Sequence, residues 1–445
     1  MNQRFHSVRL LEEKCKGCTN CIKRCPTEAI RVREGKAVIN PERCIDCGEC
    51  VRTCENHAKT VVTSSLKDLE TFRFRIAIPA PALYGQLGKG VQPGQVVHGL
   101  LSLGFDAVCD VSFGADVATE CTRRYIRRTP SPRPLISSAC PAVVRLIQVR
   151  FPGLLPHVAR VESPMFAAAR LSRMEVSEER GIPPEDVGVF FITPCAAKVT
   201  AVIAPLGSEC SYVDGAIAIS DIFGQLSEAV ASGVTAKPLH AGSGLGVGWA
   251  GNGGELRALG LSNTLAVDGI HNVISLLEEV ETGRLRGVDY IEALACPAGC
   301  VGGPVSVENP FVARVRVREV ADGLLSEVGP DTSGEVAAIL DKHGEESFEI
   351  LGDIPALSGL ELDRDLKTAI AMMGQLEKVL ADLPGLDCGA CGSPTCRALA
   401  EDIVRGNASE TDCMFKLRER MREVAEELLG LTKKDLPAMG RRDGK

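Results

Sequence analysis

Short apolar runs alternate with helical patterns over residues 66 to about 320. The runs that predict strands are 74–78, 107–111, 134–136, 187–193, 216–219, 265–267 and 289–295. Helical spacing of apolar positions occurs at 91–103, 116–128, 142–150 and 164–179, with Asp116 or Thr119 near the start of the second helix. Strands that alternate with helices predict parallel sheet covered on both faces, and the ligands of such sheets gather at the carboxyl ends of the strands.

Three of those strand ends carry cysteine next to proline. The cysteines are Cys140, Cys195, Cys296 and, four residues further on, Cys300. Lys198 follows the second of them. One such cysteine alone is typical of an inert core thiol. Four at the strand ends, together with a lysine, predict a buried metal pocket lined by thiolates.

Residues 1 to about 65 contain two copies of the spacing C-x-x-C-x-x-C-x-x-x-C. The cysteines are Cys15, Cys18, Cys21 and Cys25 in the first copy and Cys44, Cys47, Cys50 and Cys54 in the second. The segment resembles bacterial two-cluster 4Fe–4S ferredoxins, which transfer electrons. The resemblance implies that the first three cysteines of each copy share a cluster with the last cysteine of the other. Two zinc knuckles are the alternative.

Residues 321–383 predict a helical connector, with a helix at 361–383, and residues 384–445 a small iron–sulfur domain with a tail. Cys388, Cys391, Cys396 and Cys413 follow the spacing C-x2-C-x4-C-x16-C, which fits a 4Fe–4S cluster, with zinc as the alternative. The segment resembles the small iron–sulfur domain of corrinoid iron–sulfur proteins. An amphipathic helix over 415–429, stopped by Gly430, offers a dimer face or a packing face, and a frayed tail is expected from residue 435.

The composition indicates the cellular compartment of the protein and argues against some kinds of partner. Nineteen cysteines without a signal peptide indicate a cytoplasmic protein and metal ligands rather than disulfides. The net charge of −8 argues against nucleic acid as the main partner, and we interpret the basic residues between Arg123 and Arg133 as a solvated face or a docking patch. The absence of an apolar run of about 18 residues argues against a membrane span.

The three cysteine motifs at the strand ends resemble, in order and separation, the signature motifs of FeFe-hydrogenases over residues 75–310. The resemblance implies an α/β domain at 66–320 with parallel sheets in two lobes, beside a small ferredoxin-like α+β domain and a small helical C-terminal domain. It implies an H-cluster whose 4Fe–4S cubane is bound by Cys140, Cys195, Cys296 and Cys300. Cys300 would also bridge to a two-iron subsite with carbonyl, cyanide and dithiolate ligands.

Other matching positions have roles implied by the same resemblance. Lys198 would donate a hydrogen bond to a cyanide ligand. Pro194, Ala197 and Leu294 would shield the two-iron subsite from water. Ser163 keeps the Ser-Pro context of the family.

The chain departs from the fast enzymes of the family in its proton path. Those enzymes have a relay cysteine just before the first ligand, whereas Ala139 stands here and has no titratable group. The expected carboxylates are also shifted, so Glu120, Cys121 and Cys109 become the candidate relay residues. This pattern resembles the sensory branches of the family and implies slow turnover.

A glycine-rich stretch at 242–251 contains a formal G-x-G-x-x-G. No clear strand precedes it, and further glycines interrupt the helix that a pyrophosphate would need. We therefore interpret it as a loop that packs close to the cluster.

Together these features predict a low-turnover FeFe hydrogenase that interconverts H2 with protons and electrons and has a sensory or regulatory role. Three accessory 4Fe–4S clusters are expected besides the H-cluster. The expected partners are a redox protein of the ferredoxin type or a signalling protein, hydrogenase maturation proteins, and a second copy of the chain. The alternative is a non-catalytic iron–sulfur electron carrier or cluster-assembly protein that keeps only cubane clusters.

Overall fold

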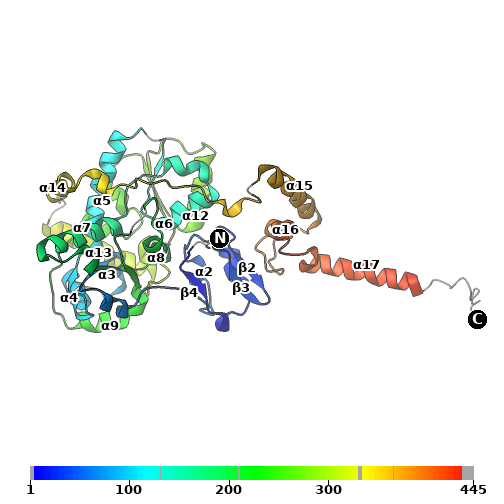
Figure 1. The fold of residues 1–445 in the computed structure, drawn as a ribbon, viewed down its shortest axis with the longest axis horizontal. Helices are drawn as coiled ribbons and strands as arrows, with labels where there is room; N and C mark the ends of the chain where they lie inside the picture. Colours follow the sequence, from blue (N-terminus) through cyan, green and yellow to red (C-terminus); the bar gives the residue numbers. More distant parts are fainter. Residues whose placement is uncertain (1–4, 131, 209–210, 329–332, 364, 433–445) are drawn as a thin grey trace, which may run out of the picture.

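The computed structural model describes residues 5–130, 132–208, 211–328, 333–363 and 365–432. Figure 1 shows a large domain of sheets and helices, a small N-terminal domain beside it, and a helical C-terminal region that ends in one long helix. The tail expected from residue 435 lies outside the described residues. Among the helices of the described part, none is both long and apolar enough to cross a membrane.

The large domain is built on two parallel sheets. One has the strand order β6-β5-β8-β9 and the other has the order β10-β11-β7. The strands are β5 (Phe74–Pro79), β6 (Ala107–Val108), β7 (Leu135–Ile136), β8 (Val187–Thr193), β9 (Gly215–Ala218), β10 (Thr264–Asp268) and β11 (Tyr290–Leu294). Every residue of β8 and β11 is buried, because helices cover both faces. The predicted α/β class with parallel sheets in two lobes is confirmed.

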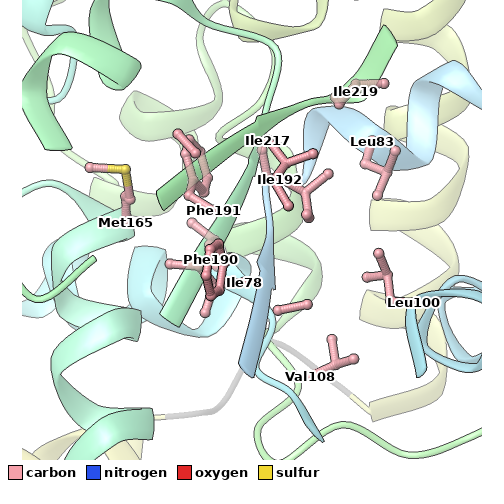
Figure 2. Packing of buried hydrophobic residues seen from close by; sticks show 14 of the residues in the cluster. Ile78, Leu83, Leu100, Val108, Met165, Phe190, Phe191, Ile192, Ile217 and Ile219 are labelled. Atoms are coloured by element: carbon pink, nitrogen blue, oxygen red, sulfur yellow. The ribbon is translucent and has the colours of Figure 1, made fainter. Parts of the chain in front are cut away.

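Eleven helices of the described chain connect and cover these strands. They are α3 (Ala82–Gln86), α4 (Pro93–Ser102), α5 (Val111–Arg128), α6 (Pro141–Arg150), α7 (Pro164–Arg180), α8 (Ala196–Ile203), α9 (Ile219–Ala231), α10 (Gly244–Gly248), α11 (Gly254–Leu259), α12 (Ile270–Glu281) and α13 (Pro310–Val328). Figure 2 shows part of the core that they close, with Met165 of α7 beside Phe191 of β8 and Leu100 of α4 on the other side of the strand. Replacing such a buried phenylalanine with alanine costs about 3–5 kcal/mol of stability.

Helix α5 begins earlier than the sequence predicted. The expected strand at 107–111 ends at Val108, and the helix expected from Asp116 starts at Val111. The cause is Asp110, whose carboxylate accepts a hydrogen bond from the Ser112 amide at 3.0 Å and so caps the helix. Asp116 and Thr119 therefore lie inside α5 rather than at its start.

The N-terminal domain has two antiparallel strand pairs and two short helices. Its elements are β1 (Val8–Leu10), α1 (Asn20–Arg24), β2 (Ile30–Arg33), β3 (Lys36–Ile39), α2 (Glu49–Arg52) and β4 (Lys59–Val61). β1 pairs with β4, and β2 pairs with β3. This is the predicted small α+β arrangement.

The C-terminal region contains α14 (Ser333–His343), α15 (Leu366–Asp382), α16 (Cys396–Val404) and α17 (Met414–Thr432). Helix α17 continues past Gly430, where we expected it to stop. The expected domain limit at residue 320 falls inside α13, and Phe348 is buried in a cluster with residues of α5. The Leu357 amide donates to the Gln148 carbonyl of α6 at 2.9 Å. We propose that the large domain extends to about residue 360 and that the connector begins there.

Candidate metal centre

Four thiols converge where strands of the two sheets end. Cys140 follows β7 and precedes α6, Cys195 follows β8 and precedes α8, and Cys296 and Cys300 follow β11. The thiol of Cys195 interacts electrostatically with the other three, so the four lie together. The structure thus brings the four predicted ligands together from three distant segments of the chain.

The chemistry of this thiol group fits a metal cluster. Burial raises the pKa of the Cys195 and Cys296 thiols, and it raises the pKa of Cys300 to about 12 although the Lys198 ammonium opposes the shift. Such thiols stay protonated unless a cation takes the place of the proton, and iron binds thiolates. Four cysteines as the donor set fit a 4Fe–4S cubane.

A cavity lies beside Cys195 and Cys300. Its remaining lining is Ala80, Pro81, Ala82, Val111, Ala115, Ala139, Pro164, Phe191, Pro194, Lys198, Trp249, Ala250, Glu255, Glu292 and Leu294. The wall is therefore apolar except for one lysine and two glutamates. A group bound against Cys300 would be enclosed by apolar side chains, with Lys198, Glu255 and Glu292 as the polar side chains of the lining besides the cysteines.

The residues predicted from the sequence divide into those at the cavity and those beside it. The cavity is lined by Ala139, Pro194, Cys195, Lys198, Leu294 and Cys300. Ala197 packs in the neighbouring hydrophobic core. Ser163 precedes the lining residue Pro164, and its Oγ is buried without a hydrogen-bond partner.

Lys198 brings a positive charge to the cavity. Its Nζ lies 5.7 Å from the centroid of the Phe191 ring. Among the described residues it forms no ion pair with a carboxylate. A lysine whose neighbours are an aromatic face and thiols is free to donate to an anionic ligand.

Two buried glutamates in the cavity wall, Glu255 and Glu292, are candidate functional residues that sequence reasoning missed. Glu255 accepts hydrogen bonds from the hydroxyls of Tyr290 at 2.6 Å and Ser137 at 2.7 Å. Glu292 accepts from the backbone amides of Gly253 at 2.8 Å and Leu256 at 3.1 Å. The available signal was Glu292 itself, because a carboxylate inside a fully buried strand is rarely there for packing.

Both carboxyls hold protons more strongly than usual. Burial raises the pKa of Glu255 to about 7. Burial and the negative charge of Glu255 raise the pKa of Glu292 to about 8. Two carboxyls with such pKa values in one cavity are suited to exchange protons near neutral pH.

The glycine-rich stretch forms part of the cavity wall. Asp116 of α5 accepts hydrogen bonds from the Ser243 amide at 2.7 Å and its hydroxyl at 2.6 Å, which fixes the start of α10. A Cβ atom on Gly246 would lie only 2.1 Å from the Ser112 carbonyl oxygen, so only glycine fits there. The loop places Trp249 and Ala250 in the lining.

The three relay candidates named from the sequence do not line this cavity. Glu120 forms ion pairs with Arg123 at 3.4 Å and Arg124 at 3.0 Å. Cys121 lies in a separate hydrophobic cluster, where burial raises its pKa to about 12. Cys109 is fully buried next to the Ala168 carbonyl.

The N-terminal domain brings its eight cysteines together in two groups of four. The Cys21 thiol interacts with Cys15, Cys18 and Cys54. A small cavity is lined by the other four, Cys25, Cys44, Cys47 and Cys50. The groups match the sharing of ligands between the two repeats that the ferredoxin resemblance implied.

The four C-terminal cysteines also lie close together. Cys413 is buried in a hydrophobic cluster with Cys391 and Cys396, and Cys391 interacts electrostatically with Cys388. Of these four, only Cys388 is exposed. The arrangement fits one more cluster near the protein surface.

The three cysteine-rich regions are in direct contact. Arg52 of α2 donates from Nη1 to the Cys296 sulfur at 3.6 Å, which joins the N-terminal domain to the strand-end thiols. On the other side of the N-terminal domain, the Val32 amide donates to the Gly392 carbonyl at 2.7 Å. Figure 1 accordingly shows the N-terminal domain between the large domain and α16.

Comparisons with known proteins agree with this arrangement. Residues 73–260 and 254–304 match the family model "Iron only hydrogenase large subunit, C-terminal domain". Residues 7–55 match a 4Fe-4S dicluster domain, and residues 383–415 match a model described as a putative Fe-S cluster.

Curated relatives include both hydrogenases and assembly factors. The periplasmic Fe hydrogenase large subunit of Nitratidesulfovibrio vulgaris is 33% identical over an alignment of 214 residues, and the match covers 44% of this chain and 51% of the relative. The cytosolic Fe-S cluster assembly factor nar1 of Emericella nidulans is 23% identical over 208 residues, covering 41% of this chain and 34% of that protein. The chain thus spans about half or less of the length of these curated relatives.

Among solved structures, a variant of the FeFe-hydrogenase HydA1 from Chlamydomonas reinhardtii matches with a TM-score of 0.52 and 18% identity. The match covers 66% of this chain and 98% of that one. At this identity the likeness shows the fold. Since the family model spans more than half of the residues and the four strand-end cysteines fall inside it, the chain belongs to the iron-only (FeFe) hydrogenase family.

Proposed function

We propose that this chain interconverts H2 with protons and electrons at an H-cluster, slowly, and in a sensory or regulatory role. The observation that carries the proposal is the apolar cavity beside Cys300, with Lys198 and two protonatable glutamates in its wall. None of these three side chains is needed as a ligand of the cubane, which supports a second group bound in the cavity. When bound, the two-iron group would supply the site at which H2 is made or split.

The chain's own residues would hold and shield that group. Cys140, Cys195, Cys296 and Cys300 would bind the cubane, and Cys300 would also bridge. Lys198 would donate to an anionic ligand of the two-iron group. Pro194 and Leu294, with the rest of the apolar lining, would keep water away and strengthen that contact by lowering the local dielectric.

Protons would use a route different from the family's usual one. Ala139 lines the cavity and cannot carry a proton. Glu292 and Glu255 both line it, and Glu255 is hydrogen-bonded to the hydroxyls of Tyr290 and Ser137. We propose that a proton passes between the two carboxyls and through these hydroxyls, whose O–H groups can donate and accept in turn.

Electrons would follow the contacts between the domains. One cysteine group of the N-terminal domain lies next to the strand-end thiols, because Arg52 contacts both Cys47 and Cys296. This group consists of Cys25, Cys44, Cys47 and Cys50. The other group of the N-terminal domain, formed by Cys15, Cys18, Cys21 and Cys54, would be the next step of the route. The C-terminal cysteine region contacts the N-terminal domain through Lys23, which donates to the Pro394 carbonyl at 3.2 Å. We propose that the C-terminal cluster is where a redox or signalling partner exchanges electrons with the chain.

The second candidate function is that of a cluster-assembly or electron-carrier protein without a two-iron group. The relatives named as Fe-S cluster assembly factors favour it. Infrared spectroscopy of protein produced with the hydrogenase maturation proteins separates the two. Bands from iron-bound carbonyl and cyanide are expected, whereas a fully maturated protein that lacks them but holds its cubane iron would refute the hydrogenase proposal.

A further inference from the structure

Helix α17 carries an apolar seam that no described part of the chain covers. Its apolar residues recur at alternating steps of three and four, at Met414, Leu417, Met421, Val424, Leu428 and Leu431. This is the a and d pattern of a coiled coil, with methionine or leucine at a and leucine or valine at d. All six side chains are at least 38% exposed, and no residue of α17 is buried.

The seam faces away from the rest of the C-terminal domain. The groove between α17 and the end of α15 is lined on the helix by Phe415, Lys416, Arg418, Glu419 and Arg422, none of which belongs to the seam. Figure 1 shows α17 projecting from the body of the protein. A helix of 19 residues is about 28 Å long, so the seam is accessible over nearly three heptads.

We infer that α17 pairs with α17 of a second copy of this chain as an antiparallel two-stranded coiled coil. A second copy of the same helix is the partner that the charges beside the seam favour. In an antiparallel pair the a positions of one helix meet the d positions of the other, and the g positions of the two helices face each other. With Met421 opposite the second copy's Val424, all six seam residues find a partner in the second seam.

The same register brings opposite charges together. Arg420 and Glu427 occupy g positions, and in this register Arg420 of each copy faces Glu427 of the other. At the e positions Arg418 faces Ala425, so no like charges meet there. A parallel pair would instead place Arg420 next to Ala425 and Glu427 next to Thr432, with no ion pair. The pattern therefore favours the antiparallel dimer, which is a closed two-fold arrangement.

Existing contacts of Arg420 do not prevent this pairing. Arg420 lies 2.9 Å from Glu423 in the same helix, and both side chains are more than half exposed. Such an i, i+3 pair contributes little and can be exchanged for a contact across the interface.

Sedimentation equilibrium of the anaerobically purified full chain, over a concentration series, tests the inference. A monomer–dimer equilibrium is expected. Leu428→Glu should raise the dissociation constant by at least about 100-fold, because a charge enters the seam. Leu429→Glu is the matched control, since Leu429 is equally exposed (60% against 58%) but lies outside the seam. Because none of these residues is buried, iron content and helicity should not change.

The orientation is tested by charge reversal. Arg420→Glu should weaken the dimer about tenfold, since it turns two attractive pairs into repulsive ones, and the double variant Arg420→Glu/Glu427→Arg should restore it to within about threefold. Glu426→Arg, at an outward position, is the control. A chain that is monomeric throughout, or a dimer indifferent to Leu428→Glu, would overturn the inference. A dimer broken by Leu428→Glu but indifferent to Arg420→Glu would overturn the antiparallel register.

Discussion

Two groups of four cysteines lie near each other in this protein, and their surroundings differ in kind. Around Cys25, Cys44, Cys47 and Cys50 the cavity is lined by these cysteines, by apolar residues, and by Thr27, Asp46 and Glu49. Beside the strand-end group the cavity continues past Cys300 to a lysine and two glutamates. The lining of the second cavity therefore includes a cationic side chain, which the lining of the first lacks.

The carboxylates near the two groups differ in their charged partners. Asp46, beside the first group, accepts from the Ser7 amide at 3.0 Å and the Thr200 hydroxyl at 2.8 Å, and it lies 3.7 Å from Arg145 in a buried ion pair. Glu255, at the second, accepts from two hydroxyls, and among the described residues neither it nor Glu292 forms an ion pair. The comparison teaches that a buried carboxyl without a cationic partner holds its proton more strongly, which proton chemistry near neutral pH requires.

The largest effect is expected from replacing Cys300, a proposed cluster ligand that also lines the cavity beside the strand-end cysteines. Cys300→Ala should abolish H2 evolution and the infrared bands of carbonyl and cyanide, while the accessory clusters remain visible by electron paramagnetic resonance. Cys121→Ala is the control, because Cys121 is buried in a different cluster, and its activity should stay within about twofold. Carbonyl and cyanide bands that survive in Cys300→Ala would contradict the bridging role.

Neutralising the glutamates is the next largest change. Glu255→Gln or Glu292→Gln should lower H2 evolution about 100-fold, the scale of a lost proton-transfer group, with the infrared bands kept. Glu120→Gln, which alters a carboxylate outside the cavity, should change the rate less than about twofold. Equal losses in all three variants would contradict the proposed route.

The rate of H2 evolution should depend on pH in the direction that the pKa values of the two glutamates set. The raised pKa values mean that Glu255 and Glu292 keep their protons up to about pH 7 and pH 8. H2 evolution needs a protonated donor, so in the native chain it should be greatest below pH 7 and fall as the pH rises through 7 to 8. In Glu292→Gln this fall should be lost or shifted, because glutamine does not titrate.

The difference between the two regions also explains what the sequence could predict. The ferredoxin ligands lie within short repeats, so their spacing alone specifies the site. The strand-end cysteines were predictable because parallel strands present their carboxyl ends at one edge. Glu255 was not predictable, since its place opposite Glu292 depends on how α11 packs on β11. Asp110 was missed as a helix cap because it lies inside the run 107–111, which was interpreted as one strand.

A smaller effect is expected at the junction between the two regions. Arg52 is partly buried; burial lowers its pKa, but Cys296, Cys47 and the ion pair with Glu49 raise the pKa by more, so the guanidinium stays positively charged beside the sulfur. Arg52→Gln should lower the reduction potential of the cubane, because the charge that stabilises the reduced cluster is lost. Redox titration followed by infrared spectroscopy measures this shift. Arg52→Lys, which keeps the charge, should recover part of it, and an unchanged potential in Arg52→Gln would contradict an electrostatic role.

The smallest expected effect concerns the docking of the C-terminal domain. Asp402 pairs with Arg31 at 2.6 Å and Arg33 at 2.8 Å in a partly buried site. Asp402→Asn should weaken this docking by about 1 kcal/mol, the scale of a partly exposed ion pair. Proteolysis of the C-terminal domain should become several-fold faster, while H2 evolution with an artificial reductant that feeds the other clusters stays unchanged. Arg257→Gln, which breaks an exposed ion pair with Asp322 far from this junction, is the control.

Because only the C-terminal cluster lies beyond the junction, a loss of activity with the natural protein donor alone would identify that cluster as the point of electron entry.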